Sequence, residues 1–301
     1  MTSQKAYGKA ADYARKVIDM GEHSPLTQTQ WEDPTNGFNN GASNNAWIWG
    51  LTTSAENQSN LISNIAHRSN EALYGYGNLY MLGVNQALYS RISDQDFRKH
   101  SWFDPESGYN YRLAGGGQVA QIDAQTYYFI YGQYGFQAPK YASLKFRPAD
   151  GDVLNYTVGN GADWCLMRIE EMYFIEMEAE LNLSGLEKAQ TLLNDFMQTY
   201  RYDSYDCTLV SMTEEAFISE MMLQKRIEFW GEGLLFFDYK RLDQGITRGY
   251  TGSNIPAVAQ FNCEGRSPQW NIVITRGEFQ SNKVVVNQNN PDPTGKLELW
   301  K

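Results

Sequence analysis

Glutamates in three predicted helical segments could supply the pair of carboxylates that a glycoside hydrolase needs. Hydrolysis of a glycosidic bond takes one acid and one nucleophile or base, about 5 to 10 Å apart on either side of the bond. The candidate pairs are Glu170/Glu171, Glu176/Glu180 and Glu228/Glu232. The same spacings also serve solvated helix faces and structural ion pairs, such as Glu228 with Arg226 or Arg241. We interpret these glutamates as structural and expect no catalytic residue.

Other catalytic and metal-binding patterns are missing from the sequence. There is no G-x-S-x-G nucleophile elbow, phosphate-binding loop or dinucleotide-binding fingerprint, and Gly115–Gly117 is a lone flexible turn. Three isolated histidines are predicted to be polar loop residues: His23, His67 and His100. The cysteines are odd in number and widely spaced, at Cys165, Cys207 and Cys263. The sequence therefore predicts no disulfide framework, metal site or cofactor.

Aromatic residues give the strongest indication of a ligand. They form 14% of the 301 residues and include 20 Tyr and 8 Trp. A sugar ring stacks its C–H face on an aromatic ring, while amides and carboxylates bind its hydroxyls. The first choice of platform is the glycine-punctuated stretch from Asn70 to Tyr80, with the candidate ligand-binding residues Tyr74, Tyr76, Asn78 and Tyr80.

A second candidate platform surrounds Trp102, and further aromatics are expected to pack. Three residues of suitable type lie near Trp102 in the sequence: Asp104, Tyr109 and Tyr111. Trp47 and Trp49 alternate with Ile48 as in a buried strand, so at least one of these tryptophans should belong to the core. Packing is also the predicted role of Trp230, Phe236 and Phe237.

The charge of the chain argues against nucleic acid and anionic membrane surfaces as partners. Its net charge is −10 and its pI is near 4.9, which disfavours binding to phosphates. No apolar run approaches the roughly 18 residues of a membrane-spanning helix. The N-terminus enters an amphipathic segment without an apolar stretch, so no signal peptide is visible. No targeting signal or lipid anchor is expected within this chain.

Helical periodicity is strongest at the N-terminus and between residues 166 and 242. Apolar residues recur at helical spacing over 6–21, and Gly21 is placed to end that helix. Helices are also expected over 166–183, from Ser184-x-x-Glu187 to Tyr200, from Ser211-x-x-Glu214 to Gly231, and over 234–242. Short turns between them predict antiparallel hairpins. The predicted fold is mainly α, with tetratricopeptide-like helical hairpins, long loops and a few short β-strands.

The remainder of the chain is rich in loop-forming residues. Residues 23–161 contain Asn, Ser, Gly and Tyr with short apolar pieces, and this stretch is the predicted ligand region. Residues 247–301 suggest loops with short strands at Ile272–Ile274 and Val284–Val286. No linker divides the chain, so a single domain over residues 1–301 is expected.

The segment from Gln224 to Arg241 carries a family motif. It resembles the E-R-R-x-E-F-x-x-E-G-x-R-x-x-D-L-x-R segment of the SusD/RagB family of nutrient-binding surface lipoproteins. Eight positions match, whereas Gln224 and Leu235 replace a usual Glu and Arg; the matches are Arg226, Glu228, Phe229, Glu232, Gly233, Asp238, Lys240 and Arg241.

Four further pieces follow the order of that family. Leu166–Glu180 resembles its R-x-A-E-x-Y-L-x-x-A-E-A helix, with Glu170 in place of the Ala. The closing elements resemble Trp270–Thr275 followed by Glu278, Asn282 and Gln288–Pro291, although both prolines of the P-I-P motif are missing. Asp94–Arg98 and Lys140–Tyr141 correspond to a D-x-R and a K-Y pair. The resemblance covers about 6–291 and is to the C-terminal part of such proteins.

The resemblance implies a function and a location. A SusD-like protein would bind glycans or oligosaccharides without catalysis and deliver them to a SusC-like TonB-dependent transporter. It would sit on the extracellular face of the outer membrane, lipid-anchored in the full-length protein. Two alternatives stay open: a glycoside hydrolase, and a helical scaffold that binds proteins or peptides.

Overall fold

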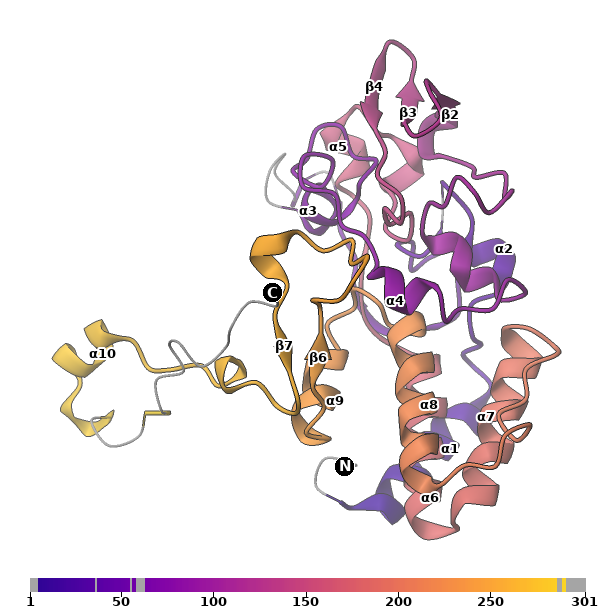
Figure 1. The fold of residues 1–301 in the computed structure, drawn as a ribbon, viewed down its shortest axis with the longest axis vertical. Coiled ribbons are helices and arrows are strands. Elements are labelled where there is room, and N and C mark those ends of the chain that lie inside the picture. The colour runs from indigo at the N-terminus through magenta and orange to yellow at the C-terminus, as the bar shows by residue number, and fades with distance from the viewer. Residues whose placement is uncertain (1–4, 36, 55, 58–62, 286–288, 291–301) are drawn as a thin grey trace. The chain divides into compact units, whose positions relative to one another are not determined.

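The computed structural model describes residues 5–35, 37–54, 56–57, 63–285 and 289–290 (Figure 1). By its contacts the chain forms two compact units, and the expected single domain over 1–301 stays a prediction. The larger unit comprises residues 1–84 and 88–232, and the smaller unit comprises 85–87 and 233–301. The main boundary falls within the Gly-rich segment that follows α8 (Glu214–Glu228). Within the described residues, no helix is long and apolar enough to cross a membrane.

The larger unit has a helical part in which α1 (Tyr7–Met20) packs along α6 (Ile169–Leu183). Small residues allow this close approach, because Ala10 and Ala11 meet Ala179 in one buried cluster. Gly21 ends α1 as predicted: its φ of 68° is left-handed, and its N–H donates to the carbonyl of Ile18. The N-terminal amphipathic helix is therefore present where periodicity placed it.

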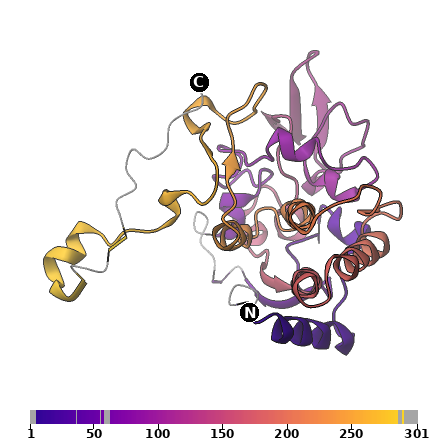
Figure 2. The same cartoon turned by 60° about the horizontal axis from the view of Figure 1, so that its bottom comes forward.

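Helix α7 (Leu186–Tyr200) follows α6 through a turn at Ser184 and Gly185 and packs against it. In Figure 2 the salmon and orange helices of this part are seen nearly end-on, beside one another. Both predicted capping boxes are wrong in detail. Gly185, not Ser184, is the N-cap of α7, and the Ser184 hydroxyl donates to Glu180 instead. Thr213, not Ser211, caps α8, accepting from the N–H of Ala216 at 3.3 Å.

The loop-rich part of the larger unit contains two small antiparallel sheets. Strand β1 (Trp47–Leu51) pairs with β5 (Trp164–Arg168), and β2 (Gln118–Gln121), β3 (Tyr127–Tyr131) and β4 (Tyr134–Gln137) form a meander. In Figure 1 the meander lies at the opposite end of this unit from α6, α7 and α8. Short α-helices lie between these pieces: α2 (Gln28–Trp31), α3 (Asn64–Arg68) and α5 (Tyr156–Gly159); α4 (Gln86–Tyr89) has residues in both units. The arrangement confirms a helix-rich chain with a few short strands.

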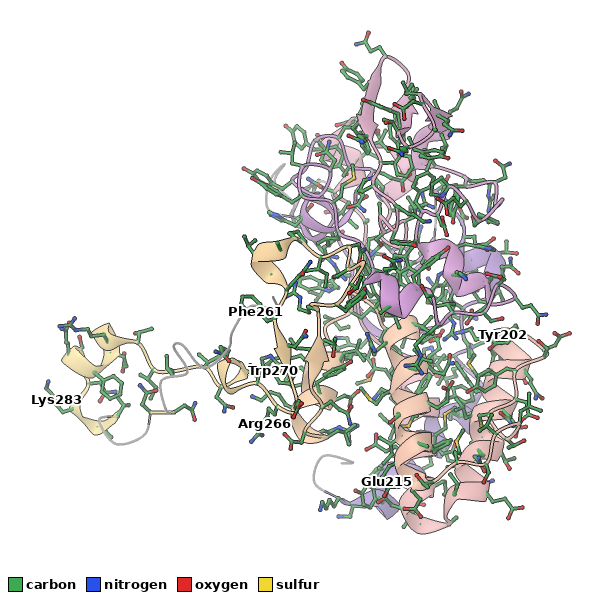
Figure 3. The ribbon with its side chains drawn as sticks, viewed as in Figure 1. Tyr202, Glu215, Phe261, Arg266, Trp270 and Lys283 are labelled. Atoms are coloured by element: carbon green, nitrogen blue, oxygen red, sulfur yellow. The ribbon has the colours of Figure 1, made fainter. Side chains whose placement is uncertain are left out.

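The smaller unit holds α9 (Leu235–Arg241), a two-stranded pairing of β6 (Ile246–Thr247) with β7 (Asn262–Cys263), and α10 (Arg276–Ser281). Trp270 packs on α9, 6.1 Å from the ring of Phe236 and 6.2 Å from that of Tyr239 (Figure 3). The predicted packing role of Phe236 and Phe237 is only partly met, because both rings are exposed. Since α8 and α9 belong to different units, the second predicted hairpin stays a prediction.

The two strands predicted in the C-terminal region are not observed. The backbone of Ile274 pairs with the side chain of Asn289, whose amide accepts from the Ile274 N–H at 2.7 Å. A side chain thus takes the hydrogen bonds that a neighbouring strand would supply. Residues Lys283–Val285 form a 3-10 turn, and Val286 lies outside the described residues. Gln288 and Pro291, which belong to the closing elements of the family resemblance, also lie outside the described residues.

Candidate functional site

Charged residues of the helical part form a buried charge cluster around Glu228, at the end of α8. Three arginines donate to this carboxylate: Arg98 at 2.8 Å, Arg168 at 2.7 Å, and Arg201 at 2.7 and 2.8 Å. They come from a 3-10 turn (Phe97–Ser101), from β5 and from the end of α7. The expected partners Arg226 and Arg241 are not the ones used, and Arg241 instead pairs with Asp238 inside α9.

Glu232 extends the cluster toward Lys145. Its carboxylate accepts from Arg168 at 2.9 Å and from Lys145 at 2.6 Å. Burial opposes ionisation of Glu228, yet Arg201, Arg168 and Arg98 outweigh it and hold the pKa of Glu228 well below its usual range. Burial lowers the pKa of Lys145 to about 8, with Glu232 opposing that shift. These carboxylates stay ionised and fully engaged, so the pair Glu228/Glu232 braces the fold.

The other carboxylate pairs are also engaged within the protein. Glu170 accepts from the N–H of Leu26 at 2.8 Å and forms an ion pair with Arg168 at 2.8 Å. Glu176 accepts from Arg15 at 2.8 Å, and Glu180 accepts from Ser184. Burial raises the pKa of Glu171 to about 7, and Glu232 adds to the shift. Glu171 lines none of the cavities described below.

Gln224, which replaces the usual Glu of the motif, fits into the buried charge cluster. Its amide oxygen accepts from Arg98 at 2.7 Å, and its amide nitrogen donates to Glu220 at 2.9 Å. Arg98 already binds two carboxylates, Asp96 at 2.6 Å and Glu228. A neutral amide at position 224 therefore satisfies the guanidinium without adding a third negative charge.

The predicted tyrosine platform, the Asn70–Tyr80 loop, is anchored at its base. The Asn70 amide donates to the carbonyls of Leu82 and Ser143 at 2.8 and 2.9 Å and accepts from the Leu82 N–H at 2.9 Å. Glu71 is buried and accepts from the N–H of Ala114 and from Tyr131 and Arg147. The loop is thus held by hydrogen bonds from segments distant in sequence.

Two glycines allow the Asn70–Tyr80 loop to pack closely against α3 and its C-terminal cap. A Cβ on Gly75 would lie 2.3 Å from the Ala66 carbonyl oxygen, and one on Gly77 would lie 2.1 Å from that of Ser69. The Gly77 N–H donates to the Ala66 carbonyl at 2.8 Å. Only residues without a Cβ permit this approach, and the contact leaves the intervening side chain of Tyr76 on the outside.

The four candidate residues of this loop have different environments. Tyr76 and Tyr80 are exposed, at 42% and 76%. The Tyr76 ring stacks on the His67 ring, 5.4 Å apart and 17° from parallel. Tyr74 instead packs on the core, where burial raises the pKa of its hydroxyl, and the side-chain oxygen of Asn78 is buried as well. The structure therefore brings Tyr76 and Tyr80 to the surface and turns Tyr74 inward.

The second predicted platform is a packed aromatic cluster. Trp102 has no exposed surface and meets the Trp230 ring edge-to-face at 5.8 Å, so it offers no ring to a ligand in this structure. The Tyr111 hydroxyl donates to the Trp102 carbonyl and accepts from the N–H of Asp104, both at 3.0 Å. Tyr109 stacks face-to-face on His100 at 3.6 Å. The burial that hides Trp102 could not be inferred from its neighbours in sequence.

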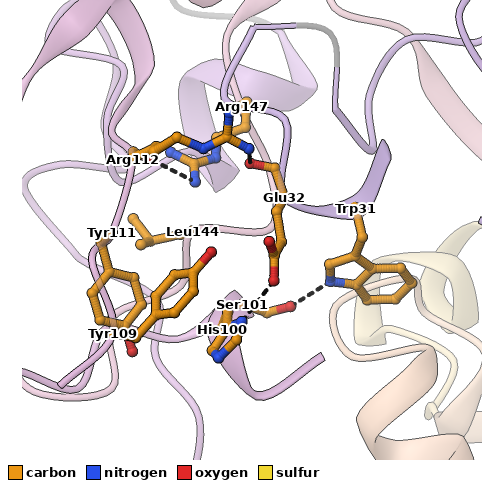
Figure 4. Close-up of a pocket in the computed structure, with 9 residues that line it drawn as sticks. All are labelled: Trp31, Glu32, His100, Ser101, Tyr109, Tyr111, Arg112, Leu144 and Arg147. Atoms are coloured by element: carbon orange, nitrogen blue, oxygen red, sulfur yellow. Dashed lines mark hydrogen bonds and ion pairs between the residues drawn. The ribbon is translucent and has the colours of Figure 1, made fainter. Parts of the chain in front are cut away.

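A small cavity lies beside Tyr109 and Tyr111 (Figure 4). His100 hydrogen-bonds Glu32 at 2.6 Å, and the Trp31 indole donates to Ser101 at 2.6 Å. Burial acts to raise the pKa of Glu32, but hydrogen bonds from His100 and Gln28 outweigh it, so the pKa of Glu32 is lowered. The cavity measures about 10 Å³, which is near the minimum for one water molecule. It is too small for a sugar ring.

The sequence model of the SusD family matches residues 36–289. The chain belongs to the SusD family. The expected family membership is therefore confirmed. The motif segments from Gln224 to Glu232 and from Leu166 to Glu180 contribute residues to the buried charge cluster. Much of the family motif in this chain therefore has a structural role. A search of curated proteins found no significant match.

Several solved structures share the fold. A SusD-like carbohydrate binding protein from Bacteroides vulgatus is 21% identical with a TM-score of 0.63, covering 96% of this chain and 57% of that one. A SusD superfamily protein from Bacteroides thetaiotaomicron is 20% identical with a TM-score of 0.60, and the match covers 95% of this chain and 57% of that one. Surface glycan-binding protein A from Bacteroides uniformis is 18% identical with a TM-score of 0.57, and the match covers 96% of this chain and 57% of that one. The chain thus spans a little over half the length of these proteins.

Proposed function

We propose that this SusD-family chain takes part in non-catalytic binding of glycans at the cell surface, with the Asn70–Tyr80 loop as one contact. The observation that carries the proposal is the exposure of Tyr76 and Tyr80 on a loop held rigid at its base. A loop that is held in place before binding loses little entropy on contact with a sugar. The carbohydrate- and glycan-binding names of the structural neighbours support the same class of ligand.

The absence of catalysis is part of the proposal. All three candidate carboxylate pairs have members that accept hydrogen bonds from arginines, backbone or a hydroxyl of the same chain. A glycosidase would keep one carboxyl protonated and aimed at the leaving oxygen; the pKa of Glu171 is raised to about 7, but this residue lines none of the cavities described above. The glycoside hydrolase alternative is tested by incubation with plant, host and microbial polysaccharides. We expect no new reducing ends; release that is abolished by one carboxylate substitution would establish hydrolysis instead.

Family membership also supports a partner and a location. A SusC-like TonB-dependent transporter would receive the bound oligosaccharide, and the full-length protein would be lipid-anchored at the extracellular face of the outer membrane. Co-purification of the full-length protein with a large β-barrel transporter tests the partnership. Recovery of the protein in a soluble fraction, free of any such transporter, would contradict it.

Glycan-panel binding by the full-length protein tests the ligand class. We expect at least one oligosaccharide to bind, with the affinity reduced by loss of Tyr76 and Tyr80. The helical-scaffold alternative predicts a different outcome, in which peptides bind and no glycan does. A panel that includes peptides of varied charge therefore separates these two functions in one measurement.

A further inference from the structure

A polar pocket in the larger unit is lined by none of the residues of the Asn70–Tyr80 loop. It measures about 220 Å³ and is lined by side chains and backbone from three segments, around residues 35–53, 147–150 and 161–163. An apolar cavity of about 150 Å³ accommodates benzene, so this pocket has room for one pyranose ring. Its polar side chains include Thr35, Asn40, Thr53, Asp150 and Asp163.

Backbone hydrogen bonds fix the pocket wall. Asp163 accepts from the N–H of Gly41 at 3.0 Å with one oxygen and from the N–H of Thr53 at 2.9 Å with the other. The Thr53 hydroxyl donates to the Ala162 carbonyl at 2.8 Å. A carboxylate has about four acceptor positions, so Asp163 retains capacity for two more donors. Hydroxyls of a bound sugar are donors of the required kind.

Two exposed tryptophans belong to the strands that lead to this pocket. Trp164 directly follows Asp163 and is 41% exposed. It pairs across β1 and β5 with Leu51, so these two side chains share one face of the sheet. Trp49, two residues before Leu51, is 61% exposed. Sequence reasoning placed at least one tryptophan of β1 in the core; that residue is Trp47, while Trp49 faces outward.

The charge of the pocket favours particular sugars. Asp150 and Asp163 are both acidic, and the one cation in the lining, Arg147, is paired with buried Glu71 and donates to the Arg112 carbonyl at 3.2 Å. A uronic acid would place a third carboxylate beside two others, which is repulsive. A neutral hydroxyl group or an ammonium group meets no such penalty.

We propose that the pocket at Asp163, together with Trp164 and Trp49 on the adjoining strands, binds a single neutral or amino-substituted pyranose and rejects uronic acids. The proposal rests on glycan binding as the function and names the sugar class of a second contact. Stacking on the exposed tryptophans would hold the ring, while Asp163, Thr53 and Asp150 would bind hydroxyl or ammonium groups. The tyrosine loop and this pocket would then contact different units of one oligosaccharide.

Titration of the purified chain with three monosaccharide probes tests the proposal. Methyl glucoside, methyl 2-amino-2-deoxyglucoside and methyl glucuronide are compared by saturation-transfer and ¹⁵N-indole NMR. We expect the first two to bind in the millimolar range and to shift the indole resonances that are lost in Trp164→Phe and Trp49→Phe. The glucuronide should bind at least about tenfold more weakly.

Three variants distinguish this pocket from other sites. Trp164→Ala should weaken neutral binding about five- to tenfold, as loss of one stacking contact does. Asp150→Asn should reduce the rejection of the glucuronide, because it removes one charge; Asn also tolerates the left-handed φ of 55° at this position. Tyr134→Ala, which truncates an exposed ring at the tip of the β3–β4 hairpin, is the matched control and should change nothing.

The outcomes also separate this inference from glycan binding in general. Probe binding that is unchanged in Trp164→Ala and Asp150→Asn but lost in a Tyr76→Ala/Tyr80→Ala variant would overturn the pocket and retain the loop. Failure of all three probes, alongside positive binding of longer glycans in the panel, would also overturn the pocket alone. Equal binding of glucoside and glucuronide by the unmodified protein would refute the stated sugar class.

Discussion

Glu228 and Arg201 form a bidentate ion pair in which neither side chain has exposed surface: Nε contacts Oε2 at 2.8 Å, and Nη2 contacts Oε1 at 2.7 Å. The pair joins the end of α8 to the end of α7. Two more arginines, Arg98 and Arg168, bind the same carboxylate from other segments. Three buried guanidinium charges therefore depend on one carboxylate and its neighbours for compensation.

Removal of the charge at Glu228 should therefore destabilise the fold severely. Glu228→Gln preserves the shape but leaves buried arginines uncompensated, which costs about 3 to 5 kcal/mol of unfolding free energy. Urea denaturation followed by circular dichroism measures the loss. Glu22→Gln, at an exposed position, is the control and should stay within about 0.5 kcal/mol. A Glu228→Gln protein as stable as this control would refute the bracing role of the cluster.

Glu171 should give the protein a distinct dependence of stability on pH. Burial raises the pKa of this carboxyl from 4.5 to about 7, so the folded state keeps a proton that the unfolded state releases between these values. Its contribution to stability is therefore present below pH 4.5 and is lost as the pH rises through 7. Glu171→Gln cannot titrate, so the variant should gain on the order of 2 to 3 kcal/mol relative to the unmodified protein between pH 5 and 8. Parallel urea titrations at pH 5, 6 and 8 measure this difference; a constant difference across the series would contradict it.

The sequence predicted the helices better than their contacts. Helices α1, α6, α7 and α8 follow local periodicity, which depends on residues a few positions apart. The partners of Glu228 lie 27, 60 and 130 residues away, so the nearby Arg226 and the motif residue Arg241 were the obvious but wrong choices. The N-caps were misplaced because several Ser, Thr and Gly residues lie beside each helix start, and tertiary packing selects among them.

The candidate site was predictable only in part, because exposure depends on tertiary structure. Tyr76 and Tyr74 have the same type and the same glycine-rich surroundings, yet one ring is outside and the other packs on the core. Trp102 is buried by Trp230, a residue 128 positions later in the sequence. Trp49 and Trp164 belong to one sheet only through the pairing of β1 with β5, which no local pattern indicates.

Substitution of Gly77 should displace the Asn70–Tyr80 loop. Because a Cβ at this position would lie 2.1 Å from the Ser69 carbonyl oxygen, Gly77→Ala forces the backbone away from α3. We expect a loss of about 1 to 3 kcal/mol in stability and weaker glycan binding. Gly8→Ala is the matched control, since nothing lies within 4 Å of its Cβ position in α1, and it should stabilise by up to about 1 kcal/mol. Normal stability and binding in Gly77→Ala would show that the close approach does not hold the loop.

The two exposed tyrosines should contribute to glycan affinity without contributing to the fold. Tyr76→Ala combined with Tyr80→Ala removes two stacking surfaces, and we expect affinity for the best glycan of the panel to fall by about ten- to a hundredfold. The melting temperature should hardly change, because both rings lie outside the core. Tyr74→Ala should behave in the opposite way: its ring packs on the core, so its truncation should cost about 3 kcal/mol of stability. Calorimetric titration of the folded variants decides the matter. Unchanged affinity in the Tyr76/Tyr80 variant would remove the loop from the binding site and leave the pocket at Asp163 as the remaining candidate in the described part of the chain.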